Sequence, residues 1–239
     1  MSGQGSAANS SRASNFWYGL GRRLFYVLAR LFFRLRVSGV ERIPRQGACI
    51  VAANHASYLD PPLLGCGVRH RKFHYIARLT LFRNPVLGFL FRRWGVVALD
   101  RERGGDVGAL RQALRLLKQG HVLALFPEGT RTPDGTIRDA KPGIGFLVAK
   151  AGVPVIPAHI DGTFRCLPKG RKVPRLGRVS VSFGAPIVPE EIAACARGAD
   201  GRSDFGAVSR LVMERIRNLA ERRLDQHGPD GWASPCRQV

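Results

Sequence analysis

A histidine and an aspartate five positions apart form the most reactive combination in this 239-residue sequence. They are His55 and Asp60, in the segment NHASYLD at 54–60, directly before two prolines. An imidazole accepts a proton near neutral pH, and a nearby carboxylate can fix its tautomer and stabilise the imidazolium. The pair can therefore activate a hydroxyl group, although this spacing also fits a histidine that is satisfied in a helix cap.

A second polar segment, FPEGTR at 126–131, directly follows the apolar run HVLAL. Arg131 suits a phosphate because its forked guanidinium donates two hydrogen bonds, although a surface ion pair is the structural alternative. Glu128 cannot bind a phosphate itself and is predicted to orient Arg131 or substrate hydroxyls. Gly129 permits the turn, and Thr130 can donate to the phosphate.

The remaining polar residues show no metal or serine-hydrolase pattern. The other histidines, at 70, 74, 121, 159 and 227, form no His-Glu-x-x-His or similar ligand spacing, so no metal site is expected. No Gly-x-Ser-x-Gly elbow is present, and Ser57 lies inside the histidine segment itself. We therefore expect His55 to act as a base on a substrate hydroxyl. A hydrolase that uses the pair on water remains an alternative.

Three blocks in this order resemble the signature of the 1-acylglycerol-3-phosphate acyltransferase family. They are NHxxxxD at 54–60, FPEGTR at 126–131 and VPVIP at 153–157. A fourth block, roughly GxxFIDR in the family, reads GVVALDR at 95–101. Ala98 stands where an aromatic residue is common, and Arg101 remains in register. The resemblance spans roughly residues 37–185.

The resemblance implies transfer of a fatty acyl group to the 2-hydroxyl of 1-acylglycerol-3-phosphate, which gives phosphatidic acid. The co-substrate would be an acyl-CoA or acyl-carrier-protein thioester, with no cofactor. His55 would be the general base, held by Asp60. Arg131 and Arg101 would bind the substrate phosphate with help from Lys141, because the family often places Lys-x-Gly before a helix. Another lysolipid or glycerol-3-phosphate is the alternative acceptor, and a solvated loop is the alternative for Lys141.

Two further expectations concern the transition state and the wall of the site. The tetrahedral oxyanion needs hydrogen-bond donors, and backbone N–H groups after His55 or around Gly129 are the candidates. The prolines of VPVIP are predicted to be structural, because they fix φ at the entry to a buried strand and shape the wall of the acyl site.

The charge of the chain favours anionic partners. Its 38 Lys and Arg against 17 Asp and Glu give a net charge of +21, which suits lipid surfaces, phosphorylated substrates or nucleic acid. No RNP-type, zinc-finger or helix-turn-helix pattern is present, so no nucleic acid is expected. A non-catalytic basic module that binds membranes or nucleic acid remains the second alternative. Five cysteines without paired spacing argue against a disulfide framework and predict a reducing, cytoplasmic setting.

The amino-terminal part predicts a membrane contact. Residues 1–14 are expected to be a disordered tail, and 15–36 an amphipathic helix interrupted by arginines. Arginines at several depths favour a helix that lies in the headgroup plane over one that spans the membrane, with packing on its own domain as the alternative. The resulting expectation is a peripheral or monotopic protein on the cytoplasmic face of the membrane. A second amphipathic segment at 79–94 and a basic tract at 169–175 are weaker candidates for lipid contact.

Residues 37–226 are predicted to be one catalytic α/β domain with a mostly parallel or mixed sheet flanked by helices, followed by a flexible tail at 227–239. Alternating short apolar runs and helical patterns indicate this class. The expected strands are 36–40, 49–53, 74–77, 95–99, 122–126, 155–159 and 179–183. The clearest helices are 59–67, 106–119, 144–151 and 204–226. His55 and Glu128 each follow a predicted strand, where catalytic groups of such sheets gather.

Overall fold

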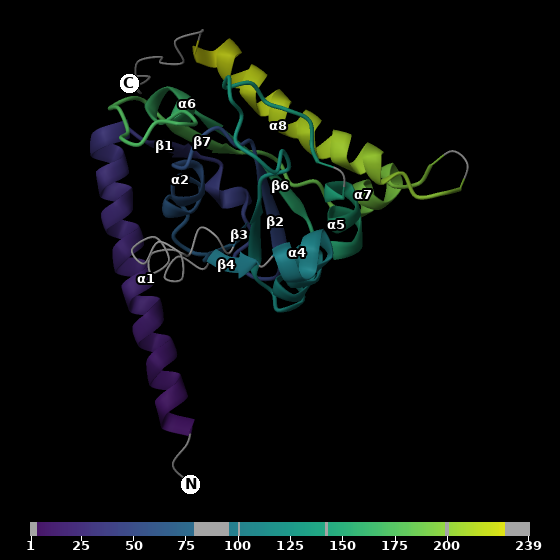
Figure 1. Ribbon diagram of the computed structural model, residues 1–239, viewed down its shortest axis with the longest axis horizontal. Helices are drawn as coiled ribbons and strands as arrows, with labels where there is room; N and C mark the ends of the chain where they lie inside the picture. The colour runs from purple at the N-terminus through teal and green to yellow at the C-terminus, as the bar shows by residue number, and fades with distance from the viewer. Residues whose placement is uncertain (1–3, 79–95, 100, 142, 199–200, 228–239) are drawn as a thin grey trace, which may run out of the picture.

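The computed structural model describes the backbone of residues 4–78, 96–99, 101–141, 143–198 and 201–227 (Figure 1). The second amphipathic segment, 79–94, and residues 228–239 of the expected tail lie outside these ranges. The strands are β1 (Arg36–Ser38), β2 (Cys49–Ala53), β3 (Phe73–Arg78), β4 (Val96–Leu99), β5 (Val122–Leu125), β6 (Val155–Asp161) and β7 (Ser180–Phe183). The helices are α1 (Gln4–Phe33), η1 (Val40–Arg42), α2 (Asp60–Cys66), α4 (Arg101–Lys118), α5 (Ile144–Ala151), α6 (Thr163–Cys166), α7 (Pro189–Cys195) and α8 (Phe205–His227).

The described strands form one mixed sheet in the order β1-β7-β6-β2-β5-β3-β4. Its neighbours pair in parallel except for β6 and β7, which are antiparallel. The carboxyl ends of β2, β3, β4, β5 and β6 consequently lie at one edge of the sheet. The predicted single α/β domain is confirmed.

Helices cover both faces of the sheet, which explains why β2 is buried at all five positions (Figure 1). Cys49, Val51 and Ala53 pack into a core with α1 and α2, whereas Ile50 and Ala52 pack into a second core with α4, α5 and α8. This alternation follows from the two-residue period of a strand. The central strand therefore joins two hydrophobic layers and gives the loop after Ala53 a rigid base.

Most predicted elements are present with shifted ends. The seven strands all form, and the helix at 144–151 matches α5 residue for residue. The helix expected at 106–119 begins at Arg101. The short helices η1, α6 and α7 were not predicted, because three to seven residues carry too little periodicity to detect.

The amino-terminal helix is longer than predicted. It begins at Gln4, inside the segment 1–14 for which a disordered tail is predicted. Residues 4–14 contain three alanines and no proline, which suits a helix. None of the helices in the described ranges combines the length and apolarity that crossing a bilayer requires.

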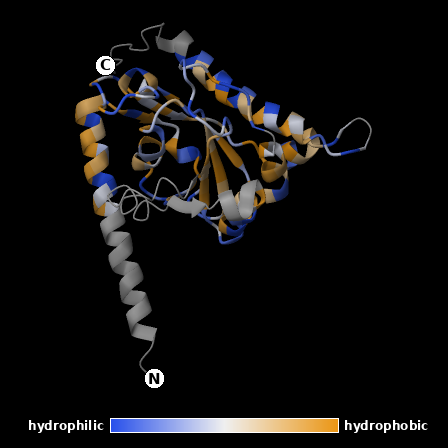
Figure 2. Ribbon diagram, viewed as in Figure 1, coloured by the Kyte–Doolittle hydropathy of each residue, from blue (hydrophilic) through white to orange (hydrophobic). Residues whose placement is uncertain are grey.

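The two sides of α1 differ in their burial. In the part of α1 that Figure 2 colours, hydrophobic residues alternate with hydrophilic ones. Ala29 and Phe33 are buried against the domain. One side of the helix therefore packs on its own domain, which was the alternative to a membrane contact. The other side carries an exposed apolar stripe, which consists of Leu20, Leu24, Val27, Leu28, Leu31 and Phe32. No described part of the chain covers this stripe, in which the spacing of three and four residues places the side chains together.

Candidate active site

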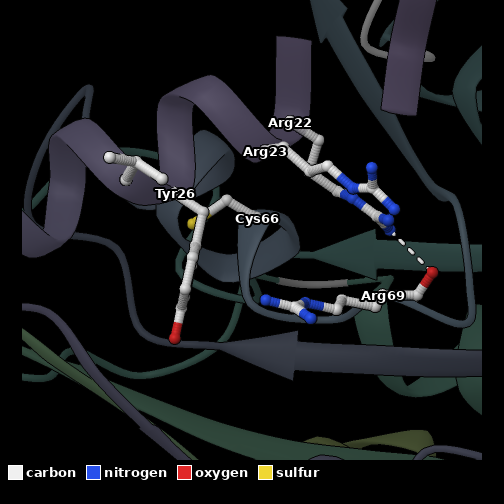
Figure 3. A pocket seen from close by; sticks show the side chains of 6 residues that line it. Arg22, Arg23, Tyr26, Cys66 and Arg69 are labelled. Carbon is white, nitrogen blue, oxygen red and sulfur yellow. Dashed lines mark hydrogen bonds between the residues drawn. The ribbon is translucent and has the colours of Figure 1, made fainter. Parts of the chain in front are cut away.

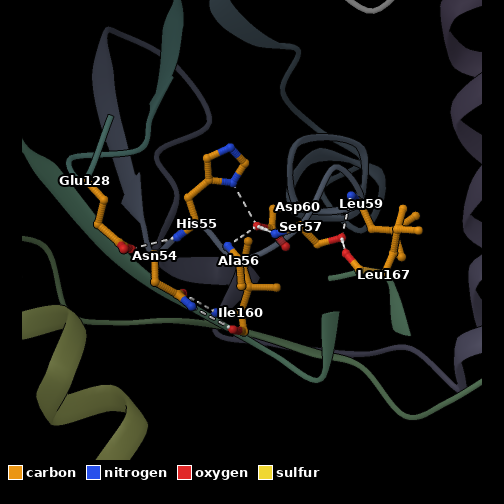
Figure 4. Close-up of polar contacts among 9 residues, drawn as sticks. All are labelled: Asn54, His55, Ala56, Ser57, Leu59, Asp60, Glu128, Ile160 and Leu167. Carbon is orange, nitrogen blue, oxygen red and sulfur yellow. Dashed lines mark hydrogen bonds and ion pairs between the residues drawn. The ribbon is translucent and has the colours of Figure 1, made fainter. Parts of the chain in front are cut away.

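The His55–Asp60 pair forms at the carboxyl end of β2 (Figure 4). The Nδ1 atom of His55 lies 2.8 Å from Oδ2 of Asp60. The same oxygen accepts hydrogen bonds from the backbone N–H groups of Ala56 at 2.6 Å and Ser57 at 2.7 Å. Asp60 is fully buried and is the first residue of α2, so these donors fold the 54–59 loop back onto the start of the helix. His55 itself does not cap α2, and the helix-cap alternative is wrong.

The side chain of His55 is partly exposed to solvent. It is 17% exposed, and its ring stacks on Phe126 with 4.3 Å between centroids. With the proton on Nδ1 facing Asp60, Nε2 at the opposite edge of the ring is the acceptor left for a substrate hydroxyl. The geometry is that of a fixed and accessible base.

Two polar side chains fix the loop at 54–59, which we call the catalytic loop because it carries His55, to neighbouring segments at the carboxyl edge of the sheet. Asn54 donates from Nδ2 to the backbone oxygen of Ile160 at 2.9 Å and accepts from the N–H of Ile160 at 2.8 Å. Ser57 donates to the backbone oxygen of Leu167 at 2.8 Å. Both are buried, so these bonds form away from water and fix the loop against β6 and the segment that follows α6.

Glu128 contacts the backbone of His55. Its Oε1 accepts the N–H of His55 at 2.8 Å, and its Oε2 accepts the N–H of Arg138 at 3.2 Å. The side chain is only 3% exposed, and burial raises the pKa of its carboxyl group above the ordinary value. Each carboxylate oxygen thus accepts one backbone N–H, and the predicted role of Glu128 in orienting Arg131 or substrate hydroxyls stays a prediction.

Arg131 lies beside the catalytic loop. Its guanidinium carbon is 3.5 Å from the centroid of the Tyr58 ring, a cation–π contact. The adjacent residue Thr132 donates its backbone N–H to the backbone oxygen of His55 at 2.8 Å. The Nη1 atom of Arg131 is buried without a hydrogen-bond partner, and no described carboxylate pairs with the guanidinium, so the surface ion pair is wrong. A buried guanidinium N–H without a protein partner is able to donate to an anionic oxygen.

Lys141 is brought to the same turn. Gly129 has φ +65, and a Cβ built on it would lie 2.6 Å from Cδ of Lys141, so the lysine stem lies against the glycine. The backbone N–H of Lys141 donates to the oxygen of Pro127 at 2.9 Å. Thr130 is exposed at the tip of the turn. Arg101 begins α4 at the same edge of the sheet, and its side chain lies outside the described part of the structure.

Three of the backbone N–H groups that were expected to bind an oxyanion already donate hydrogen bonds within the protein. The N–H groups of Ala56 and Ser57 bind Asp60, and that of Gly129 donates to the oxygen of Phe126 at 2.9 Å. The expectation for these three groups is corrected. The sequence did not reveal Tyr58, whose contact with Arg131 crosses between two loops, although an aromatic residue inside the NHASYLD block was the available signal.

Comparisons with known proteins agree with this geometry. The family model described as Acyltransferase matches residues 34–161. The 1-acyl-sn-glycerol-3-phosphate acyltransferase BAT2, chloroplastic, of Brassica napus is 34% identical over 160 residues, which cover 65% of this chain and 46% of the relative. The 1-acyl-sn-glycerol-3-phosphate acyltransferase of Bacillus subtilis is 26% identical over 192 residues, which cover 80% of this chain and 90% of that protein. The chain thus spans less than half of the plant relative and most of the bacterial one.

A solved structure extends the match to the fold. The crystal structure of the 1-acyl-sn-glycerophosphate (LPA) acyltransferase PlsC from Thermotoga maritima has a TM-score of 0.73 and 30% identity, covering 94% of this chain and 85% of that one. The family model, the relatives and the fold lead to one assignment: the chain belongs to the acyltransferase family, the group that includes these 1-acyl-sn-glycerol-3-phosphate acyltransferases.

Proposed function

We propose that this protein transfers a fatty acyl group from a thioester to the 2-hydroxyl of 1-acylglycerol-3-phosphate and forms phosphatidic acid in phospholipid synthesis. The observation that carries the proposal is the 2.8 Å contact between Nδ1 of His55, whose side chain is partly exposed, and Oδ2 of a fully buried Asp60. The names of the relatives and of the structural neighbour support the same reaction.

In the proposed reaction, Nε2 of His55 removes the proton of the 2-hydroxyl as that oxygen attacks the thioester carbonyl. The tetrahedral intermediate collapses, the carbon–sulfur bond breaks, and the imidazolium returns the proton to the departing thiolate. Asp60 holds the proton-bearing Nδ1 and stabilises the imidazolium between these steps. No acyl-enzyme and no cofactor or metal ion is part of this proposal, in which the thioester of CoA or acyl-carrier protein is the co-substrate.

The acceptor phosphate is proposed to bind at the turn that follows β5. The unpaired Nη1 of Arg131 supplies one donor, and Lys141 supplies a second positive charge against Gly129. Thr130 is placed to donate as well, and Arg101 is assigned here from its register in the family block. Glycerol-3-phosphate or another lysolipid carries a phosphate that would fit the same donors, and it is the alternative acceptor.

The exposed apolar stripe of α1 supports a peripheral or monotopic position on a membrane. Such a stripe gains free energy when it enters the boundary between headgroups and acyl chains, and flanking arginines favour anionic lipids. We place the protein on the cytoplasmic face, with residues 37–226 as the catalytic domain. The lysolipid acceptor would then come from the bilayer.

The decisive experiment incubates the purified protein with acyl-CoA and a panel of lysolipids and identifies the products by mass spectrometry. His55→Ala should lower kcat by about 10²- to 10⁴-fold, because general-base assistance is lost. His70→Ala is the matched control, since this partly buried histidine binds the backbone oxygen of Ile43 and not the site. Equal loss in both variants would refute the role of His55.

Asp60→Asn and Asp60→Ala separate catalysis from architecture. Asparagine keeps one oxygen for the three donors of the loop, so it should lose less stability than alanine does, and it should lose turnover because a neutral amide cannot stabilise the imidazolium. Alanine should lose both. An asparagine variant with wild-type kcat would contradict the proposed pair.

The same assay distinguishes the alternatives. Release of thiol that does not depend on an added lysolipid would identify a hydrolase. Absence of thiol release, together with binding to RNA or vesicles that His55→Ala leaves unchanged, would identify a non-catalytic basic module.

A further inference from the structure

Three of the most exposed large hydrophobic side chains of the described residues lie on two neighbouring segments. Leu176 is 75% exposed, Leu31 is 70% and Val173 is 69%. Leu31 is on the apolar stripe of α1, whereas Val173 and Leu176 lie in the loop between α6 and β7, residues 167–179, which we call the α6–β7 loop. Isolated exposed apolar residues need no explanation, but such a cluster does.

The α6–β7 loop is tied to the end of α1. The backbone N–H of Gly177 donates to the oxygen of Phe32 at 3.3 Å, and that of Val179 donates to the oxygen of Phe33 at 2.9 Å. Figure 1 shows the loop beside the carboxyl-terminal end of α1. The exposed apolar residues of the loop, Val173 and Leu176, therefore belong to a segment that is held against the carboxyl-terminal end of α1.

The same loop is also tied to the catalytic segment. The backbone oxygen of its first residue, Leu167, accepts a hydrogen bond from the hydroxyl of Ser57 at 2.8 Å. Ser57 lies two residues after His55. Within the loop, the N–H of Arg175 donates to the oxygen of Cys166 at 2.8 Å. The loop is consequently linked by a direct hydrogen bond to the segment that carries His55.

The charge of the α6–β7 loop is entirely positive. It contains no acidic residue and five basic ones, Lys169, Arg171, Lys172, Arg175 and Arg178. Cationic residues that flank exposed apolar side chains match an anionic bilayer, in which headgroups meet the charges and acyl chains meet the tips.

Positive charge also flanks the stripe of α1 farther from the loop. A hollow of about 160 Å³ between α1 and α2 is lined by Arg22, Arg23, Tyr26, Val27, Cys66 and Arg69 (Figure 3). Arg22 donates to the backbone oxygens of Val68 and Arg69, which holds the helix against the domain. Arg23 and Arg69 form no ion pair with any carboxylate among the residues that the structure describes, and Val27 belongs to both the hollow and the stripe.

We propose that the α6–β7 loop is a second membrane-docking element, which inserts Val173 and Leu176 into an anionic phospholipid bilayer beside α1. The inference rests on the membrane association proposed above and specifies how the site faces the bilayer. Two contacts fix the orientation of a rigid body better than one helix, which can roll about its own axis. The loop thereby holds the segment that carries His55 close to the membrane surface from which a lysolipid arrives.

The test compares binding of the full chain to vesicles of phosphatidylcholine alone and of phosphatidylcholine with phosphatidylglycerol, measured by co-flotation. V173S/L176S removes the apolar tips, and V107S/V188S is the matched control, because Val107 and Val188 are exposed on α4 and at the start of α7. K169Q/K172Q/R175Q removes three loop charges, and R111Q/R115Q/K118Q removes three exposed charges from α4 as its control.

We expect V173S/L176S to lower the vesicle partition coefficient by about tenfold or more, since two large side chains lose their apolar environment. K169Q/K172Q/R175Q should lower binding to anionic vesicles by roughly fivefold per charge and leave binding to neutral vesicles unchanged. Both control variants should bind as the wild type does. Loop variants that bind like their controls would overturn the proposal.

A second measurement separates docking from chemistry. Acyl transfer to lysophosphatidic acid embedded in vesicles should fall in the loop variants, whereas transfer to a short-chain, water-soluble acceptor should not. Equal loss with both acceptors would overturn the proposal, because it would assign the loop to the site itself. Release of the wild type from vesicles by inorganic phosphate, but not by chloride of equal ionic strength, would also overturn it in favour of a free-phosphate site. If the wild type acylates neither acceptor, the proposed reaction fails, while the flotation result still decides the docking proposal.

Discussion

Oε1 of Glu128 lies 2.8 Å from the backbone nitrogen of His55, 73 positions earlier in the chain. This bond joins the loop after β5 to the loop after β2. Together with the bond between Thr132 and the oxygen of His55, it holds the main chain of the base on both sides. The buried acid thus acts on the orientation of the imidazole through the backbone.

Glu128→Gln should lower kcat while KM stays close to the wild-type value. An amide offers one acceptor, so one of the two N–H groups loses its partner, at a cost of about 1–3 kcal/mol. The KM of the acceptor should change little, because the carboxylate contacts the backbone of His55 and Arg138. Steady-state kinetics tests this split, and a rise in KM without loss of kcat would assign Glu128 to the substrate instead.

The same variant has a pH signature. Burial raises the pKa of Glu128 above 4.5 in the folded state, so the folded protein holds this proton to higher pH than the unfolded chain does. Wild-type stability relative to Glu128→Gln should therefore fall as pH rises from 4.5 through the raised pKa. Denaturant unfolding between pH 4 and 7 measures this difference in unfolding free energy. A difference that does not change with pH would show that burial does not raise the pKa of Glu128.

Much of this fold could be predicted from local pattern. The strand at 49–53 and the helix at 144–151 match the structure residue for residue. The strand ends where the apolar run meets Asn54, and Gly143 and Gly152 flank the helix. His55 and Asp60 could be identified because both lie within one short loop. The partner of Glu128 could not, since the bond crosses the sheet edge and ends on a backbone group that carries no sequence signal.

The contact between Arg131 and Tyr58 predicts how the acceptor phosphate is held. The ring fixes the plane of the guanidinium and leaves its edge for the ligand. Tyr58→Leu should raise the KM of the acceptor by about 2- to 30-fold, which corresponds to the usual range of a cation–π contact, and leave kcat nearly unchanged. Tyr58→Phe retains the ring and is the control. Similar kinetics for phenylalanine and leucine would show that the contact contributes nothing.

The turn at Gly129 predicts a coupled effect on stability. Gly129→Ala places a Cβ at φ +65, which costs roughly 1–2 kcal/mol, and brings it against the stem of Lys141. In a Lys141→Ala background the clash disappears and the backbone strain remains. The double variant should consequently be more stable than the sum of the single effects by about 0.5 kcal/mol or more. Unfolding free energies of the four proteins give the coupling, and strict additivity would place the lysine stem elsewhere.

His74 on β3 predicts sensitivity to acid away from the site. Its ring stacks on His121 with 4.3 Å between centroids, and burial, followed by the charges of His121 and Lys72, lowers the pKa of His74 to about 4. The unfolded chain takes up this proton near pH 6.5, so the folded state loses stability as pH falls from 6.5 towards 4.

Replacing His74 with glutamine should remove that part of the pH dependence. With a discount for partial exposure, the loss between pH 6.5 and 4 should be smaller in His74→Gln by about 1–2 kcal/mol. His159 also has a pKa lowered to about 4 by burial, but it is present in both proteins, so it cancels from the difference between them. Urea unfolding at several pH values gives the two slopes. Parallel curves would mean that the imidazole of His74 is free to take up a proton in the folded protein.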